Sequence, residues 1–299
     1  MATGRFAPSP TGSLHVGNLR TAMVAWLFAR STGSRFVLRI DDLDPADARA
    51  EHEAQQLADL AAIGLDWDEP VLRQSARRAE HAGAIAALVA AGRTYECWCT
   101  RREIRESAAA PHGPAGSYPG TCRRLTEAER AERRASGRPA ALRLDAGGEV
   151  VTFVDRLRGP VSVVVDDLVL RRNDGIPAYN LAVVVDDAAQ GVEEVVRGDD
   201  LLESTPRQIL VARLLGLEAP SYAHVPLVLG ADGARLAKRH GAVSLADLAA
   251  VGVDAPAVVS RLAESLGLAA AGERVVLAEL VGRFDPAALP RQPWTWVSP

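Results

Sequence analysis

One stretch, RFAPSPTGSLHVGN from Arg5 to Asn18, constrains the fold more than any other part of the chain. Residues 3–7 suit a short strand, a turn rich in proline and glycine follows, and apolar residues then recur with helical spacing from Gly17 to Arg30. Such a turn lets the backbone approach a ligand closely, and the start of a helix offers unpaired N–H groups to a phosphate. His15 would add a side-chain donor there. Taken alone, the stretch fits a nucleotide site and an ordinary strand-to-helix turn about equally well.

The remaining elements alternate between strand and helix. We expect strands at 36–40, 181–187, 192–200 and 224–229, and helices at 47–63, 76–91 and 206–215. Thr205 would be the N-cap of the last helix, and Pro206 would occupy its first position. This order is typical of a doubly wound α/β sheet.

The pattern changes between about 93 and 175. A loop interrupted by glycine and proline runs from Cys97 to Cys122, followed by an Arg- and Glu-rich helix at 124–135 and strand-like runs at 140–145, 151–155 and 161–170. The arginines of 123–143 could contact RNA phosphates, but the spacing of Glu129 and Arg133 favours a solvated helix. We therefore expect a divided core with an inserted α+β module: core at 1–92 and 176–243, module at 93–175, and a short helical region at 244–299.

The composition is that of an ordinary globular protein, with 48% hydrophobic and 24% charged residues. A net charge of -4 argues against a uniformly basic nucleic-acid surface. The first residues lack the apolar region of a secretory signal, and no run of about 18 apolar residues suggests a membrane span. Three clustered cysteines are a poor disulfide framework and favour a cytoplasmic protein with reduced thiols. We expect His52 and His81 to be exposed, and Trp26, Trp67 and Trp98 to serve packing.

A second candidate site lies in the downstream loop GADGARLAKRHGA. Its three cations, Arg235, Lys238 and Arg239, could stabilise charge that develops on a transferring phosphoryl group. A solvated basic loop would explain the same residues. Because no G-x-x-x-x-G-K motif occurs, ATP would have to be held in another way.

Together the two stretches resemble the HIGH and KMSKS signatures of class I aminoacyl-tRNA synthetases. RIDDLD at 39–44, AYNLAVVVDD at 178–187 and VVRGDDLLESTPRQ at 195–208 look like the glutamyl branch, so the resemblance covers nearly all of 4–245. It implies a Rossmann-type catalytic core that activates L-glutamate with ATP and Mg²⁺. The chain ends about 60 residues after the KMSKS-like loop, without room for an anticodon-binding domain. This resembles the free-standing branch that glutamylates queuosine in the anticodon stem-loop of tRNA(Asp).

The resemblance also implies roles for single residues. For ATP they are His15, Gly17, Asn18, Arg235, Lys238 and Arg239, with His15 and Lys238 catalytic. For glutamate they are Arg5, Ala7, Ser9, Asp41, Tyr179 and Arg197. Arg5 would bind the side-chain carboxylate, and Asp41, where the family pattern has Glu, the α-ammonium. Pairing of Arg197 with Asp199 or Asp200 is the alternative. The KMSKS-like loop departs from the pattern, with Arg235 for the first Lys and Ala237 for the Ser.

The cysteines form a compact ligand set. By chemistry alone, three thiolates and His112 would make a common closed zinc site. The queuosine branch instead has C-x-C…Y-x-x-x-C, so the resemblance implies one structural Zn²⁺ on Cys97, Cys99, Tyr118 and Cys122. Buried thiols without a metal are the alternative.

Three other functions are compatible with the sequence. The chain could be a truncated synthetase that charges the 3′ end of tRNA(Glu), or an HxGH-type nucleotidyltransferase without an RNA substrate. It could also be a synthetase core that acts only as a binding protein. No protein partner and no membrane association are expected.

Overall fold

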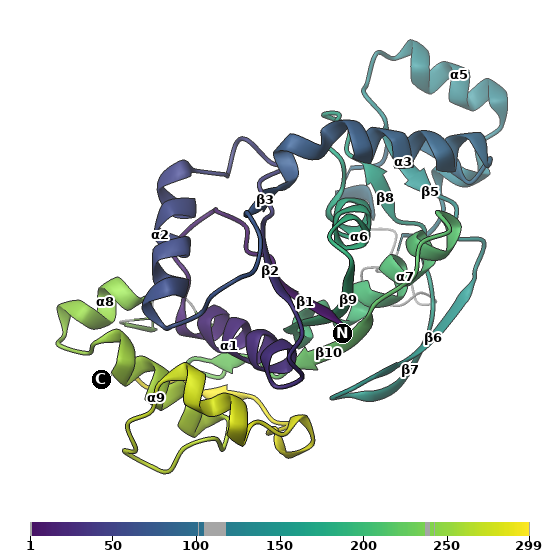
Figure 1. Cartoon of the computed structure of the whole chain (residues 1–299). Coiled ribbons are helices and arrows are strands. Elements are labelled where there is room, and N and C mark those ends of the chain that lie inside the picture. The colour runs from purple at the N-terminus through teal and green to yellow at the C-terminus, as the bar shows by residue number, and fades with distance from the viewer. Residues whose placement is uncertain (1, 101, 105–117, 237–239, 242, 299) are drawn as a thin grey trace.

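The computed structural model describes residues 2–100, 102–104, 118–236, 240–241 and 243–298, and its centre is a five-stranded parallel sheet (Figure 1). In spatial order the strands are β10 (Ser221–Val225), β9 (Val192–Gly198), β1 (Thr3–Phe6), β2 (Phe36–Ile40) and β3 (Leu72–Arg73). The chain builds outward from β1 in both directions. The sheet therefore has a topological switch point between β1 and β9, the position where doubly wound folds bind ligands.

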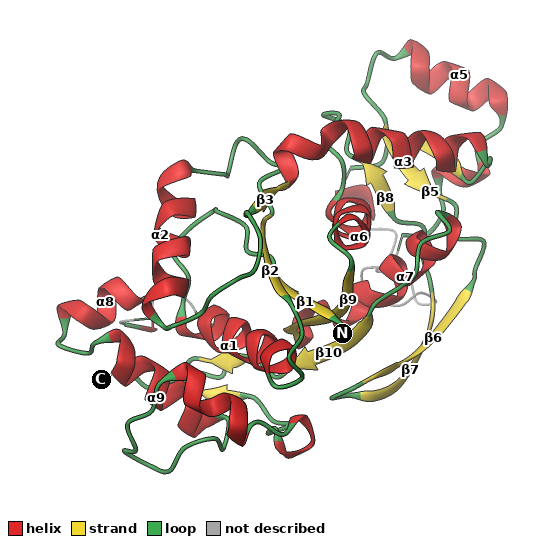
Figure 2. Ribbon diagram, in the orientation of Figure 1, coloured by secondary structure: helices red, strands yellow, loops and turns green. Residues whose placement is uncertain are grey.

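Helices cover both faces of the sheet, each over its own apolar core (Figure 2). One face carries α1 (Val16–Arg30), α2 (Ala50–Ala62), α8 (Leu245–Ala250) and α9 (Ala255–Ser265); the other carries α3 (Arg78–Ala90), α6 (Tyr179–Ala189) and α7 (Thr205–Leu214). Twelve of the 15 residues of α1 are buried, because this helix lies between the sheet and the C-terminal helices. The start of α1 is thus held firmly next to β1.

The C-terminal region continues past α9 as short elements. They are the 3₁₀ helices Leu277–Arg283 and Pro286–Ala288 and the strand β12 (Trp294–Thr295), which pairs with β11 (Val228–Leu229). Trp296 is 1% exposed and belongs to the core around α1, so this tail is packed onto the main body. None of the helices in the described part of the chain combines the length and apolarity that a membrane span requires.

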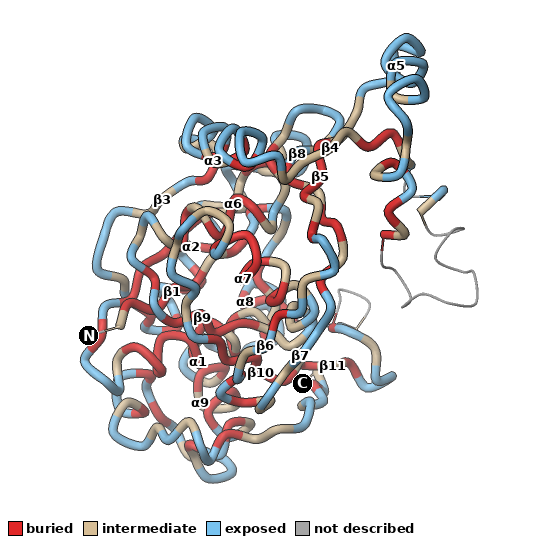
Figure 3. Tube along the Cα trace, turned by 90° about the vertical axis from the view of Figure 1, so that its right-hand side faces the viewer, coloured by how far each residue is buried: buried red, intermediate tan, exposed pale blue. Residues whose placement is uncertain are grey.

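The chain between α3 and α6 forms antiparallel structure. A three-stranded sheet contains β4 (Thr94–Cys97), β5 (Ala141–Leu144) and β8 (Val169–Arg171), while β6 (Val150–Asp155) pairs with β7 (Gly159–Val164). The helix α5 (Glu127–Ala135) projects from this region without a buried residue (Figure 3). Its exposure confirms the prediction of a solvated helix.

Three expected strands differ from the structure. Residues 181–187 belong to the helix α6, because an apolar run such as LAVVV suits a buried helix as well as a buried strand. The strand expected at 224–229 ends at Val225, where Pro226 has no N–H to continue a ladder. The strand expected at 161–170 is divided into β7 and β8.

Candidate active site

A cavity of about 540 Å³ opens at the switch point, where the carboxyl ends of β1 and β9 meet. All six residues assigned to glutamate line it, as do four of those assigned to ATP: Arg5, Ala7, Ser9, Asp41, Tyr179 and Arg197 in the first group, His15, Gly17, Asn18 and Arg235 in the second. Lys238 and Arg239, with Ala237 before them, lie outside the described residues. The structure therefore gathers most of the predicted site around one cavity.

His15 is the N-cap of α1. Its Nδ1 accepts a hydrogen bond from the backbone N–H of Asn18 at 3.2 Å, and the Asn18 side chain accepts from the backbone N–H of His15 at 3.2 Å. Because a backbone N–H only donates, the proton of the neutral imidazole must lie on Nε2. Burial lowers the pKa of His15, although a backbone hydrogen bond opposes this shift. The residue therefore offers a neutral N–H donor beside the helix N-terminus, where phosphates bind well.

Gly17 has a steric role in this arrangement. A Cβ built on Gly17 would lie 3.0 Å from the His15 ring and 3.3 Å from Val228. Both contacts are closer than side chains normally make, so a larger residue would displace the imidazole from the first turn of α1. The His-x-Gly spacing is therefore needed to hold His15 in its capping position.

Arg5 and Arg39 share one buried carboxylate next to the cavity. Oδ1 of Asp187, on α6, accepts from Nε of Arg5 at 3.3 Å and from Nη1 of Arg39 at 2.5 Å. Nε of Arg39 also donates to Asp41 at 2.7 Å. Burial acts to raise the pKa of Asp187, but the charges of Arg39 and Arg5 outweigh it and hold the pKa below its usual value. Two arginines thus balance two aspartates beside the cavity.

Asp41 connects this network to the cavity, which it lines. Burial raises the pKa of Asp41 against the attraction of Arg39. A second cation would therefore stabilise its ionised form. The ammonium group of an amino acid is a cation of the right kind, and it would lie opposite the arginines that suit a carboxylate.

Arg197 reaches the cavity from the end of β9. Its Nη1 lies 3.4 Å from the hydroxyl of Tyr179, at the start of α6. The alternative pairing with Asp199 or Asp200 is wrong for the described structure, because these carboxylates bind other arginines, Arg158 and Arg235 respectively. Arg197 therefore faces the cavity as an arginine without a carboxylate partner among the described residues.

The N-cap prediction for α7 was also wrong. The N-cap is Ser204, whose side chain makes no capping hydrogen bond, and Thr205 is already the first helical residue. The hydroxyl of Thr205 instead accepts from Nη2 of Arg197 at 2.8 Å. Thr205, a residue type that often caps helices, thus holds Arg197 of the candidate site instead.

A second cavity, of about 680 Å³, adjoins the first and shares Ser9, Asp41 and Tyr179 with it. Apolar side chains and three arginines line it: Trp98, Ile104, Pro139, Ile176 and Pro177, with Arg138, Arg143 and Arg172. Two carboxylates, Asp41 and Asp44, line the cavity as well, and Arg172 is paired with Asp44 and Asp174. The lining suits a planar group flanked by phosphates, as in a nucleoside of an RNA.

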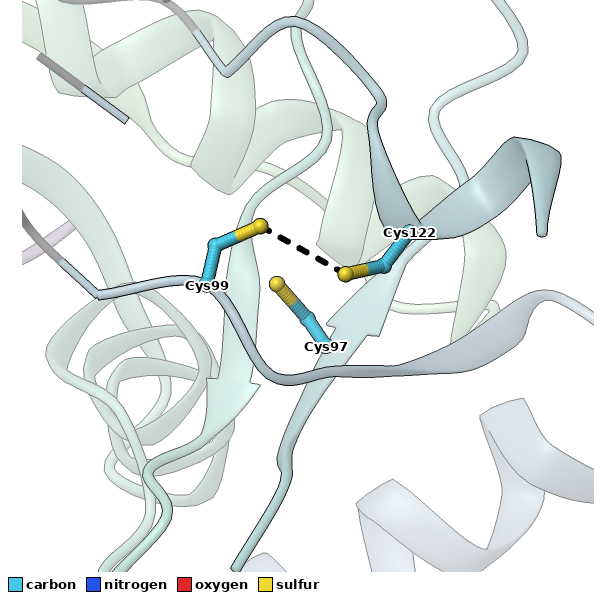
Figure 4. Close-up of side chains that lie close together, drawn as sticks. All are labelled: Cys97, Cys99 and Cys122. Atoms are coloured by element: carbon cyan, nitrogen blue, oxygen red, sulfur yellow. Dashed lines mark hydrogen bonds between the residues drawn. The ribbon is translucent and has the colours of Figure 1, made fainter. Parts of the chain in front are cut away.

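The three cysteines point toward one another (Figure 4). Their sulfur atoms lie within 4.8 Å of one another, and the Sγ atoms of Cys99 and Cys122 are 3.4 Å apart. The Tyr118 hydroxyl lies 3.4 Å from Sγ of Cys97 and 3.7 Å from Sγ of Cys99. Tetrahedral zinc places two sulfurs about 3.8 Å apart and a sulfur and an oxygen about 3.5 Å apart. The four groups therefore fit a zinc ion; His112 lies outside the described residues.

Contacts within the cluster already favour one thiolate. The hydrogen bond with Cys97 lowers the pKa of Cys122 to about 6, and the same bond, with burial, raises the pKa of Cys97 to about 12. Burial raises the pKa of the Tyr118 hydroxyl. Its oxygen, however, accepts the backbone N–H of Cys122 at 2.8 Å, and Arg143 lies 3.8 Å over its ring. Both contacts would support a phenolate bound to a metal.

A buried histidine–aspartate pair joins α3 to α6. His81 is fully buried, contrary to the expected exposure, and its Nε2 lies 3.0 Å from both carboxylate oxygens of Asp186. Arg77 and Gln74 also donate to Asp186. The charged neighbours of His81 in the sequence suggested exposure, but its partner Asp186 lies 105 positions away in the chain and becomes a neighbour only in the fold. His52, by contrast, is partly exposed, and Trp26, Trp67 and Trp98 pack against the apolar cores.

Two further residues of the site were missed. Gln56, on α2, donates from its amide to two backbone oxygens of the turn after β1, that of Ser9 at 3.0 Å among them. Asp187 could have been found from spacing, since Tyr179, Val183 and Asp187 recur every four residues and so share one face of a helix. Periodicity over 179–189 was therefore the available signal.

The chain matches the catalytic domain of class I tRNA synthetases (E and Q) over residues 1–289. It is 62% identical to the glutamyl-Q tRNA(Asp) synthetase of Nocardia farcinica, over 97% of this chain and 92% of that protein. The glutamate–tRNA ligase of Geobacter sulfurreducens is 44% identical over 81% of this chain and 52% of its own length. A crystal structure of a glutamate tRNA ligase from Elizabethkingia meningosepticum in complex with its amino acid has a TM-score of 0.85 at 27% identity, over 99% of this chain and 67% of that one.

Proposed function

Since this chain belongs to the class I tRNA synthetases of the E and Q type and is therefore a ligase, we propose that it activates L-glutamate with ATP and transfers it to queuosine in tRNA(Asp). The observation that carries the proposal is the cavity at the switch point. It brings Arg5 and Arg197, two carboxylate-binding groups, together with Asp41 and with the N-terminus of α1. The similarity to proteins named glutamyl-Q tRNA(Asp) synthetase supports queuosine in tRNA(Asp) as the acceptor.

Glutamate needs one cation for each carboxylate and one anion for its ammonium. Arg5 binds the side-chain carboxylate, and Asp41 binds the ammonium. Arg197 and the hydroxyl of Tyr179 make the remaining contacts with glutamate. The network of Arg39 and Asp187 fixes Arg5 and Asp41 before the substrate arrives. This preorganisation lowers the cost of ordering the pocket when glutamate binds.

In the first step the α-carboxylate of glutamate attacks the α-phosphorus of ATP, a carboxyl–phosphate bond forms, and pyrophosphate leaves. Substrate Mg²⁺ neutralises part of the triphosphate charge. The step needs no enzyme nucleophile, so positioning and electrostatic stabilisation supply the catalysis. Nε2–H of His15 and the N-terminus of α1 donate to the phosphates. By the family resemblance, Arg235, Lys238 and Arg239 of the KMSKS-like loop would stabilise the charge on the leaving pyrophosphate.

In the second step a hydroxyl of the acceptor nucleoside attacks the mixed anhydride and AMP leaves. The second cavity receives this nucleoside, because it adjoins the glutamate site and carries arginines for the flanking phosphates. Cys97, Cys99, Tyr118 and Cys122 would hold a zinc ion at the edge of this cavity. The ion would supply structural cross-linking of the inserted segment and take no part in the reaction.

Glutamate-dependent exchange of pyrophosphate into ATP, measured without RNA, tests the proposed activation. We expect exchange with L-glutamate and none with L-glutamine or L-aspartate. The absence of exchange with every amino acid would contradict the proposal and would favour a core that only binds its ligands. Exchange that appears only when tRNA(Glu) is added would favour the second candidate, a synthetase that charges the 3′ end of tRNA(Glu), which the glutamate–tRNA ligase relatives suggest.

A further inference from the structure

Arg197 is held from behind by a chain of buried polar groups. Its Nε donates to Nε2 of His224 at 3.1 Å, and Nδ1 of His224 lies 2.6 Å from Oδ2 of Asp155. Arg197 is 5% exposed, His224 0% and Asp155 1%. The three residues come from β9, β10 and β6, so a strand of the inserted segment supports a residue of the core. Neither His224 nor Asp155 lines the cavity.

The donor and acceptor groups determine where the protons lie in the hydrogen-bonded series Arg197–His224–Asp155. The guanidinium Nε–H can only donate, so Nε2 of His224 must be the acceptor and Nδ1 must carry the proton. Nδ1–H then donates to Asp155. Burial lowers the pKa of His224, although its bond to Asp155 opposes the shift, and this favours the required neutral ring. Burial acts to raise the pKa of Asp155, but the bonds from His224 and from backbone N–H groups outweigh it and keep the carboxylate ionised.

We infer that Asp155 and His224 are positioning residues for glutamate recognition, because they orient Arg197 so that its Nη1, beside Tyr179, meets the substrate. The inference rests on the proposed glutamate-binding role of Arg197. Nε and Nη2 of this side chain are occupied by His224 and Thr205, which leaves Nη1 as the nitrogen directed at the ligand. A long side chain held at two of its three nitrogens loses little further freedom when the substrate binds.

The environment of Asp155 makes one substitution especially informative. Its Oδ1 accepts three backbone N–H groups, from Leu157 at 2.9 Å, Arg158 at 2.8 Å and His224 at 3.2 Å. In Asp155→Asn the amide oxygen must therefore keep this position, and the NH₂ group must face Nδ1 of His224. An NH₂ group donates, so the imidazole proton would move to Nε2, where it would oppose the Nε–H of Arg197. The variant thus reverses the tautomer while the shape is conserved.

Substitutions of His224 test its hydrogen bond with Arg197 separately from its hydrogen bond with Asp155. His224→Gln places an oxygen near the position of Nε2 and keeps an acceptor for Arg197. His224→Asn places its polar group near Nδ1 and leaves Arg197 without that acceptor. His81→Asn is the matched control, because His81 is also fully buried and bonded to an aspartate, whereas its ring makes no hydrogen bond to a described residue that is assigned to glutamate.

The measurement is the KM for glutamate and for ATP in pyrophosphate exchange, with glutamate binding by calorimetry. We expect Asp155→Asn and His224→Asn to raise the glutamate KM at least tenfold and the ATP KM less than twofold, with kcat largely kept. His224→Gln should keep the glutamate KM within about threefold of the parent value. His81→Asn should lower Tm and leave the glutamate KM unchanged. Equal effects of His224→Gln and His224→Asn, or parallel changes in both KM values, would overturn the inference. If Arg197→Ala itself leaves the glutamate KM unchanged, the proposed glutamate pocket fails instead.

Discussion

Arg5 donates from Nε to Oδ1 of Asp187 at 3.3 Å, although 182 positions separate the two residues in the chain. Arg39 donates to the same oxygen and also to Asp41, so two buried guanidinium groups are balanced by two carboxylates. The side chains of the three residues are at most 8% exposed. Loss of one partner would leave a buried charge unpaired, so this ion cluster stabilises the packing of α6 against β1 and β2 and holds Arg5 in place beside the cavity.

Asp187→Asn should therefore destabilise the protein by about 3–5 kcal/mol, the range for removing one partner from a buried pair. Glu69→Gln is the control, because Glu69 pairs with Arg35 at an exposed position, where the loss is at most about 1 kcal/mol. Urea unfolding of both variants gives the comparison. Equal stabilities of the two variants would contradict the assigned role of Asp187.

The same carboxylate predicts a pH dependence. Its pKa is lowered in the folded state, so its contribution to stability is complete above the unfolded value of about 4 and is lost as the pH falls through the lowered folded value. The difference in unfolding free energy between the parent and Asp187→Asn should be constant from pH 7 to pH 5 and shrink below pH 4. If the difference in unfolding free energy instead grows on acidification, the pKa of Asp187 is raised in the folded state and not lowered.

Asp41 and Asp42 are adjacent but should differ in function. Asp41 lines the cavity, whereas Asp42 accepts the backbone N–H and the hydroxyl of Ser75. Asp41→Asn should raise the glutamate KM about tenfold or more, since a charge-assisted bond contributes about 1.5–3 kcal/mol. Asp42→Asn should leave it within about twofold. Glutarate, which lacks the ammonium group, should inhibit the parent and Asp41→Asn equally well; selective loss of glutarate binding would remove Asp41 from the ammonium site.

Arg171 and Arg172 provide a matched pair for RNA binding. Arg171 is the last residue of β8, and Arg172 follows it. Arg172 lines the second cavity, where it pairs with Asp44 and Asp174, whereas Arg171 lines a smaller hollow beside α3. Arg172→Ala should lower transfer to RNA about tenfold and leave pyrophosphate exchange unchanged. The slope of log affinity for RNA against log salt concentration should fall by about one, as expected when one phosphate contact is lost. Arg171→Ala should change neither reaction. A loss of exchange in Arg172→Ala would assign this arginine to glutamate or ATP instead.

Features that depend on the spacing of neighbouring residues could be predicted from the sequence. The turn after β1 and the start of α1 follow from one short motif next to a strand end, whereas the places of Arg5 and Arg197 beside the cavity were implied by the family resemblance. Contacts between distant segments were not predictable in this way. Asp187 and His224 gain their roles only when α6, β9 and β10 pack together, and the apolar run before Asp187 hid the helix that carries it.

Metal binding can be tested without the reaction. Cys97→Ser and Cys122→Ser should lower the zinc content of the purified protein, because each removes a ligand of the proposed set. Tyr118→Phe should weaken zinc retention against a chelator, whereas His112→Ala should not. Elemental analysis and chelator titration decide between these ligands. A His112→Ala protein without zinc would assign the fourth ligand to histidine.

One labelling experiment identifies the acceptor of glutamate. Radiolabelled glutamate and ATP are offered with three RNAs: tRNA(Asp) that contains queuosine, the same tRNA with unmodified guanosine, and tRNA(Glu). We expect label on the first RNA alone, with reduced transfer in Arg172→Ala. Label on tRNA(Glu) that is lost when its 3′ end is oxidised with periodate beforehand would show that the enzyme charges the 3′ end of tRNA(Glu) and does not act on queuosine.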